Sequence, residues 1–238
     1  MELRIDNLTQ RYRGVTALKG VCTQLRGGDT CLLLGPNGSG KTTLMKLVAG
    51  IASPSSGEIT LDGMPIGPKT KARIAYMPTE NYFYNYLSVR DAGKYYADFF
   101  ADFDRAAYEA RIDRAELDPR AFIRTLSSGM SAKLRLSLIL SRDAQVMMFD
   151  EPINGVDMLT RDWVLEEIAR RRGEGRVLLI STHLVEQAER LADCALFLRD
   201  GELVRSGSLA EICREKSLED VYREIYGNRN RSEEEETC

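Results

Sequence analysis

The sequence predicts an α/β fold in which a parallel sheet is built around a glycine-rich loop, with a small antiparallel β part and an inserted helical part. Three observations predict it. An unbroken apolar run, DTCLLLG, leads into the glycine-rich loop and then into a helical stretch. The later runs AQVMMFDE, RVLLIST and CALFLRDGELV alternate with helical stretches, which is typical of β-α-β units. Between these two parts, residues 88–142 have a helical pattern.

Short β-rich runs begin the chain. ELRIDNL is the first, and GEITLDGMPI carries an Asp62-Gly63 turn between apolar runs, which indicates a hairpin. RIAYM is a further predicted strand, and KTTLMKLVAG predicts a helix that ends at Gly50. We therefore expect a small antiparallel β part beside the parallel sheet.

The middle of the chain is predicted to be a helical subdomain, at about residues 81–143. SVRDAGKYYADFF begins with Ser88 and Asp91 in the spacing of a capping box. SAKLRLSLILSR has too many apolar positions for a surface helix. The tail 228–238, NRNRSEEEETC, lacks large apolar residues, so we expect it to be a disordered acidic tail.

Composition limits the class of protein. With 43% hydrophobic and 29% charged residues, the 238-residue chain is of ordinary globular type, and its net charge of -3 argues against a nucleic-acid partner. The five cysteines form no C-x-x-C pair, which favours reduced thiols in a cytosolic protein. No apolar run is long enough for a membrane span and no signal peptide is recognisable, so we expect any membrane link to run through a partner.

The glycine-rich loop has the spacing of a P-loop. Gly35, Gly40, Lys41 and Thr42 fit G-x-x-x-x-G-K-T between a buried strand and a helix. Backbone N–H groups and the helix dipole can bind phosphates, Lys41 can reach them, and the Thr42 hydroxyl can ligate Mg²⁺. A purely structural glycine turn would not need the Lys-Thr pair. The predicted phosphate-binding residues are Gly35, Pro36, Asn37, Gly38, Ser39, Gly40, Lys41, Thr42 and Thr43.

Two acids end a later strand. Because side chains alternate, Asp150 can serve Mg²⁺ while Glu151 addresses an attacking water. The alternative is a simple surface pair or a helix cap. His183, which is the single histidine, follows the neighbouring predicted strand. Alone it favours a structural role, but beside the P-loop and the acids it favours a γ-phosphate contact.

These residues resemble the nucleotide-binding subunit of ABC transporters, and the resemblance runs from Glu2 to about Gly227. LSSGM is similar to the family signature and begins a helix, a second place where an anion can bind. The resemblance implies one ABC ATPase domain at 1–227, with its nucleotide-binding core at about 1–80 and 144–210. It also implies ATP and Mg²⁺ as ligands and hydrolysis to ADP and phosphate.

The resemblance implies a dimer, either of two copies or with a second ABC ATPase subunit. Each ATP would lie between the P-loop of one subunit and the signature of the other. Glu151 would be the general base and His183 the switch that contacts the γ-phosphate. Tyr12 would stack on adenine, although a tyrosine on the sheet surface is the alternative. The positions that would contact nucleotide or the dimer interface are Ser127, Ser128, Gly129, Met130 and Asp157.

Three positions depart from the family pattern. Thr79 stands where a glutamine usually senses Mg²⁺, and Ser128 and Met130 replace a glycine and a glutamine of the signature. Gly129, where close backbone approach matters most, is kept. We therefore expect ATP hydrolysis to survive. The three changes concern how hydrolysis is coupled to the membrane subunit.

The segment ENYFYNYLS brings four aromatic residues to the place where the family receives a helix of its membrane partner. It predicts either an interface or a small core of the helical subdomain. The leading function is an ATPase that powers transport, with exporters of drugs, peptides or lantibiotics as the subtype, at the cytoplasmic face of the cell membrane through separate transmembrane subunits. The alternatives are a soluble ABC-type ATPase, such as an iron–sulfur assembly factor, and a nucleotide-binding regulator without turnover.

Overall fold

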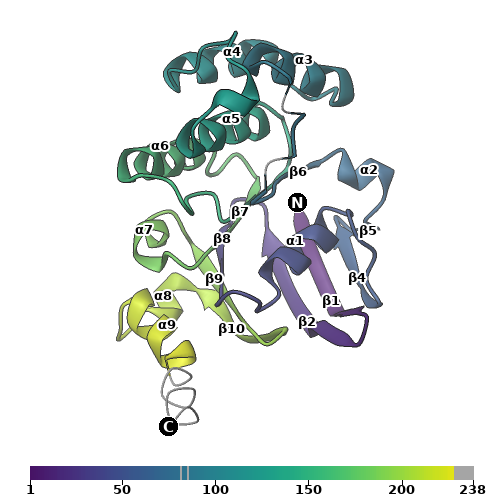
Figure 1. Ribbon diagram of the computed structural model, residues 1–238. Coiled ribbons are helices and arrows are strands. Elements are labelled where there is room, and N and C mark those ends of the chain that lie inside the picture. The colour runs from purple at the N-terminus through teal and green to yellow at the C-terminus, as the bar shows by residue number, and fades with distance from the viewer. Residues whose placement is uncertain (81, 85, 228–238) are drawn as a thin grey trace.

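A computed structural model describes residues 1–80, 82–84 and 86–227 (Figure 1). Within these residues the strands form two sheets, and a group of helices lies beyond one end of the larger sheet. This is the predicted α/β class. The predicted disordered tail lies outside the described residues.

The smaller sheet is antiparallel and has the strand order β2-β1-β4-β5. Asp62 and Gly63 both have positive φ, 51° and 73°, and join two strands in which Leu61 pairs with Met64. This two-residue turn matches the right-handed twist of the strands, so the predicted hairpin is confirmed. The strands are β1 Glu2–Tyr12, β2 Val15–Arg26, β4 Ser56–Leu61 and β5 Met64–Pro65.

The larger sheet has the order β10-β9-β3-β8-β7-β6, and every pairing in it is parallel except that of β10 with β9. The strands predicted from DTCLLLG, RIAYM, AQVMMFDE and RVLLIST are confirmed, and β8 lies between β3 and β7. The run CALFLRDGELV, predicted as one strand, is instead a hairpin of two strands, because Asp200 and Gly201 both have positive φ and turn the chain back. The strands are β3 Thr30–Leu34, β6 Ile74–Met77, β7 Val146–Asp150, β8 Val177–Thr182, β9 Cys194–Arg199 and β10 Glu202–Ser208.

The large sheet is buried on both faces, which explains the unbroken apolar run of β3. Cys31 and Leu33 pack toward the antiparallel sheet together with helix α1 (Lys41–Val48). Leu32 and Leu34 point to the opposite face, where other helices cover them. Because side chains alternate along a strand, a strand between two cores has no polar face. Gly50, with φ 66°, follows the end of α1 as predicted.

The predicted helical subdomain is also helical in the structure (Figure 1). Ser88 caps α3 by accepting a hydrogen bond from the Asp91 amide, which confirms the capping prediction. No helix of the described residues is long and apolar enough to cross a membrane. The helices are α2 Pro68–Lys71, α3 Val89–Phe99, α4 Arg105–Arg114, the 3-10 turn η1 Ile123–Thr125, α5 Ser128–Leu140, α6 Met158–Ala169, α7 Val185–Glu189, α8 Leu209–Ile212 and α9 Leu218–Tyr226.

Arg142 ties the helical subdomain to the sheet. Its side chain is 3% exposed and lies 3.0 Å from Asp102, which follows α3. It also donates to the carbonyls of Ala72 and Ile74 at the start of β6, at 2.7 and 2.9 Å, and its guanidinium lies 4.0 Å from the centre of the Phe100 ring. One buried cation therefore satisfies acceptors from both parts of the molecule.

We expect Arg142→Ala to lower the free energy of unfolding by about 3 kcal/mol or more, because it leaves a carboxylate and two carbonyls without their buried donor. Chemical denaturation measures this value. The control is Arg105→Ala: the side chains of Arg105 and its partner Asp98 are 63% and 72% exposed. The control should change stability by about 0.5 kcal/mol or less. Equal effects of the two substitutions would contradict the role of Arg142.

Candidate functional site

The P-loop, the acid pair and the histidine segment meet at the carboxyl edge of the larger sheet. In the parallel register, Leu34 of β3 pairs with Thr182 of β8, and Asp150 of β7 pairs with Ser181 of β8. The next residue along each strand therefore belongs to the P-loop, the acid pair or the histidine segment. Open α/β sheets bind their ligands at this edge.

The P-loop leads into α1, whose N-terminus is left free for an anion. Gly40 is the N-cap residue with φ 108°, no side chain caps the helix, and its first turn holds no acidic residue. The first N–H groups of a helix lack partners within the helix, and together with the dipole they favour a negative charge. Beside them lies a pocket of about 290 Å³ lined by Ala17, Asn37, Gly38, Ser39, Gly40, Lys41, Thr42, Thr43, Thr79, Glu151 and Asn154.

Lys41 is buried in this site and faces Glu151. Its Nζ donates to the carbonyls of Gly35 and Pro36, at 2.7 and 3.2 Å. It lies 3.5 Å from Glu151 Oε1, and the two side chains are 7% and 10% exposed. Among the described residues, Glu151 Oε1 and the Ser39 hydroxyl are buried without a hydrogen-bond partner. The site therefore holds polar atoms that a bound polar group would satisfy.

Glu151 also contacts His183, because Nδ1 of the ring lies 2.9 Å from Oε2 of the carboxylate. The backbone of Glu151 has φ 49°, a conformation that costs a side-chain-bearing residue on the order of 1 kcal/mol. Its amide is held by the hydroxyl and the carbonyl of Ser181, at 2.9 and 3.1 Å. The turn directs the carboxylate toward both Lys41 and His183, and such strain is typical of functional positions.

Asp150 points to a different set of partners. It accepts hydrogen bonds from the Ser181 hydroxyl at 2.6 Å and from the Tyr76 hydroxyl at 3.1 Å. Burial, with the nearby charge of Asp150, raises the pKa of Tyr76, so that the phenol stays protonated and donates. Sequence reasoning missed both partners. The signal available was a polar residue near the carboxyl end of a buried strand.

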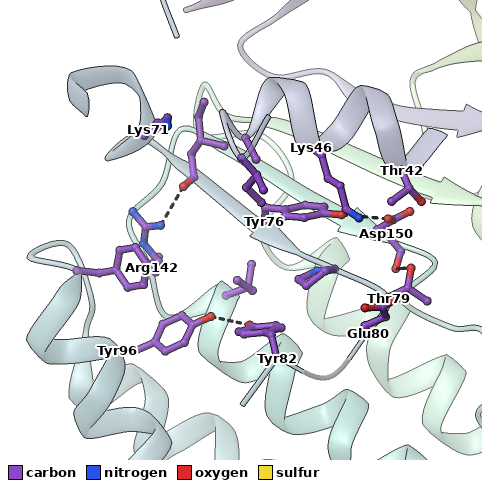
Figure 2. Close-up of a pocket in the computed structure, with 16 residues that line it drawn as sticks. Thr42, Lys46, Lys71, Tyr76, Thr79, Glu80, Tyr82, Tyr96, Arg142 and Asp150 are labelled. Atoms are coloured by element: carbon purple, nitrogen blue, oxygen red, sulfur yellow. Dashed lines mark hydrogen bonds between the residues drawn. The ribbon is translucent and has the colours of Figure 1, made fainter. Parts of the chain in front are cut away.

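Thr79 links the pocket to a larger cavity. Its hydroxyl donates to the Asp150 carbonyl at 3.2 Å, and Arg135 of α5 donates to the carbonyls of Pro78 and Thr79 at 2.9 and 2.6 Å. The larger cavity, of about 810 Å³, lies between the sheet and the helical subdomain. Figure 2 shows Thr42, Asp150 and Thr79 at one end of it and Arg142 with Tyr96 at the other.

The signature residues lie apart from the P-loop within this chain, and neither they nor Asp157 line its pocket. Ser127 caps α5 by accepting from the Met130 amide, while Ser128 is exposed at the start of that helix. A Cβ on Gly129 would lie 2.9 Å from the Thr160 hydroxyl. The packing of α5 against Thr160 within this chain therefore already favours a glycine at position 129.

Asp157 and the aromatic positions complete the predicted set. Asp157 caps α6: the amide and the hydroxyl of Thr160 donate to it and lower the pKa of its carboxyl. Tyr12, 44% exposed, ends β1. The aromatic segment is predicted to be either an interface or a small core, and its rings differ in this respect. Phe83 packs on the core and the Tyr82 hydroxyl lies 2.6 Å from that of Tyr96, whereas two stacked rings, Tyr84 and Tyr86, are 58% and 67% exposed.

A family profile described as ABC transporter matches residues 18–154, more than half of the chain. This chain belongs to the ABC transporter family. The match includes the P-loop, the signature and the acid pair. It ends before His183 and the C-terminal helices.

Relatives of this ABC family member are named as ATP-binding proteins. An uncharacterized ABC transporter ATP-binding protein of Synechocystis sp. is 35% identical over 207 residues, which are 83% of this chain and 58% of that protein's own length. Nod factor export ATP-binding protein I of Burkholderia orbicola is 31% identical over 93% of this chain and 75% of that protein. A solved structure of the ATP binding subunit of an ABC transporter has a TM-score of 0.85 at 27% identity, covering 94% of this chain and 99% of that one.

We expect Ser181→Ala to lower the free energy of unfolding by about 2 kcal/mol, because a buried hydroxyl that joins Asp150 to the Glu151 amide is lost. Chemical denaturation again provides the measurement. Ser206→Ala, at an exposed position of β10, is the matched control and should change the value by about 0.5 kcal/mol or less. A loss for Ser181→Ala no larger than for the control would show that the hydroxyl does not hold the acid pair.

Proposed function

We propose that this ABC family member is an ATP-binding and ATP-hydrolysing subunit that powers transport through separate transmembrane subunits. One observation carries the proposal: Lys41, Glu151 and His183 meet beside the free N-terminus of α1. A phosphate-binding surface and a carboxylate that can act on water thus occupy the same pocket. We further propose that residues 1–227 form one ABC ATPase domain, with a core at about 1–80 and 144–210 and a helical subdomain at about 81–143.

The site fits the triphosphate of ATP. The P-loop amides from Gly38 to Thr43 and the Lys41 ammonium would hold the phosphates, and the unpartnered Ser39 hydroxyl supplies a further donor. An arriving γ-phosphate competes with Glu151 for the Lys41 charge. Binding would thereby release Glu151 from its ion pair and leave its carboxylate free to receive a proton.

The donors also fit Mg²⁺. The Thr42 hydroxyl and the Asp150 carboxylate line the same cavity. Among the described residues, no group of three or more His, Cys, Asp or Glu side chains could hold a metal ion by itself. Two protein oxygens suit Mg²⁺, which takes its remaining ligands from phosphates and water. When bound there, the ion neutralises charge on the β- and γ-phosphates.

The hydrolytic step follows from the positions of Glu151 and His183. Glu151 accepts a proton from water as the water oxygen attacks the γ-phosphorus, and the bond to the bridging oxygen of ADP breaks. His183 can orient the carboxylate through the 2.9 Å contact of Nδ1, or donate the single N–H of its neutral ring to the γ-phosphate instead. Lys41 stabilises the phosphate oxygens. The proton thus ends on the carboxylate, and ADP and phosphate are the products.

A second subunit would complete the site. The signature residues Ser127 to Met130 begin α5 away from the P-loop pocket of their own chain. We propose that this helix N-terminus contacts ATP held by a partner's P-loop, with Asp157 near the interface. The partner is a second copy or another ABC ATPase subunit. Tyr12, exposed at the end of β1, is proposed to stack on adenine.

Transmembrane subunits are the proposed membrane partner, which would place the chain at the cytoplasmic face of the membrane. The rings of Tyr84 and Tyr86 are stacked on each other and exposed, and exposed aromatic residues are common at protein contacts. Export is the proposed direction, supported by the name of the Nod factor export relative. These relationships favour transport over a soluble iron–sulfur assembly role.

We expect Glu151→Gln to reduce ATP turnover at least about a hundredfold while ATP binding persists, because only the proton acceptor is lost. It should also accumulate an ATP-bound dimer. Steady-state phosphate release and size-exclusion chromatography with ATP measure the two effects. Lys41→Ala is the contrasting variant and should lose nucleotide affinity itself. Turnover by Glu151→Gln equal to that of the wild type would refute the catalytic assignment.

We expect affinity purification of the chain from gently solubilised native membranes to recover a protein with several membrane-spanning helices. The exposed aromatic positions supply the physical reason, so Tyr84→Ser together with Tyr86→Ser should reduce recovery while ATP binding is unchanged. Tyr95→Ser, an exposed substitution on α3, is the control. Recovery of no membrane protein with the wild-type chain would sink the transport role.

A further inference from the structure

Helix α9 is an amphipathic helix that packs at the carboxyl edge of the larger sheet. Ser217 caps it, and the apolar positions recur at the helical spacing of Leu218, Val221, Tyr222, Ile225 and Tyr226. All of these side chains pack against the core that contains β3, β7 and β8. The helix lies outside residues 18–154, which the family profile matches.

Tyr226 reaches from α9 to the strand from which the P-loop begins. Its hydroxyl lies 3.2 Å from the carbonyl oxygen of Leu34, the last residue of β3, and 3.1 Å from that of Leu198 in β9. The single phenolic proton is shared between the two acceptors. Both carbonyls belong to neighbouring strands at the sheet edge, so the hydroxyl joins these strands just before the loop.

These carbonyls set the position of Gly35. A Cβ placed on Gly35 would lie 2.4 Å from the Leu198 oxygen, so the backbone of the first P-loop glycine is packed directly against the group that Tyr226 holds. The carbonyl of Gly35 in turn accepts a hydrogen bond from Lys41 Nζ at 2.7 Å. A continuous series of contacts thus runs from Tyr226 through Leu198 and Gly35 to Lys41.

We propose that Tyr226 is a positioning residue of the ATP site: its hydroxyl fixes the ends of β3 and β9 and thereby the start of the phosphate-binding loop. The inference rests on the proposed ATP-binding function and adds α9 to the parts that build the site. It assigns the effect to the hydroxyl and separates it from the packing of the ring.

Packing alone would not require a tyrosine. The ring of Tyr226 lies 4.5 Å from that of Tyr222 and 6.5 Å from that of Phe197, contacts that phenylalanine would keep. Burial raises the pKa of Tyr226, so the phenol remains a donor throughout the physiological range. Tyr222 and His183 line one further cavity, so α9 also borders the histidine segment. Removal of the hydroxyl alone therefore tests the proposal.

The test compares Mg·ATP binding by the full-length wild-type chain, Tyr226→Phe and the control Tyr95→Phe, using isothermal titration calorimetry. Tyr95 is an exposed tyrosine on α3. Without this hydrogen bond the binding-competent position of the loop is less populated, and a shift worth one neutral hydrogen bond predicts that Tyr226→Phe binds about fivefold more weakly. The KM for ATP should rise by the same factor, while kcat at saturating ATP stays within about twofold of the wild type. The Tyr95→Phe variant should match the wild type in both measurements.

The possible outcomes separate the two proposals. If Tyr226→Phe binds ATP as tightly as the wild type, even with a lower unfolding midpoint, the hydroxyl has only a structural role and the inference is overturned while the proposed function stands. A fall in kcat with unchanged KM would likewise overturn it. If the wild-type chain binds no ATP, the proposed function fails and the inference fails with it.

Discussion

The site depends on the ion pair between Lys41 and Glu151. Two charges that are almost completely buried face each other at 3.5 Å, and removing both from water costs more than their attraction returns unless further polar contacts are made. Gly35 and Pro36 supply such contacts to Lys41, and His183 supplies one to Glu151. The strand order explains how they meet, because β8 lies between β3 and β7 and carries His183 to the space between the loop and the acid. In the proposed function, a phosphate would replace the Glu151 carboxylate as the partner of Lys41.

The residues around this ion pair are connected by hydrogen bonds. Ser181 fixes Asp150 and the amide of Glu151 together, and Thr79 holds the Asp150 carbonyl from the side of the large cavity. Arg135 binds the backbone at Thr79 from α5, the helix that begins with the signature. A displacement of the helical subdomain would therefore move the loop at Thr79 and the signature together. Although Thr79 is shorter than the glutamine usual in the family, it still contacts both Asp150 and Arg135.

The sequence was most informative where chemistry dictates residue type locally. The P-loop spacing, the Asp62-Gly63 hairpin, the Ser88 cap and the acids after an apolar run each follow from contacts within a few residues, and the structure has those elements. Ser181, Tyr76 and Tyr226 were missed, because their importance depends on which strands are neighbours. The packing of Gly129 against α6, and the contact of Phe83 with the core while Tyr84 and Tyr86 are exposed, are likewise tertiary effects.

We propose that ATP is hydrolysed between the P-loop of one subunit and the signature of another. Mixing two inactive variants tests it most directly: Lys41→Ala disables the P-loop, and Ser128→Glu places a negative charge at the exposed start of α5, where it favours the helix but repels phosphate. A mixed dimer contains one intact site, so we expect ATPase activity well above the sum of the separate variants. A mixture no more active than that sum, with an active wild-type chain, would contradict the shared site.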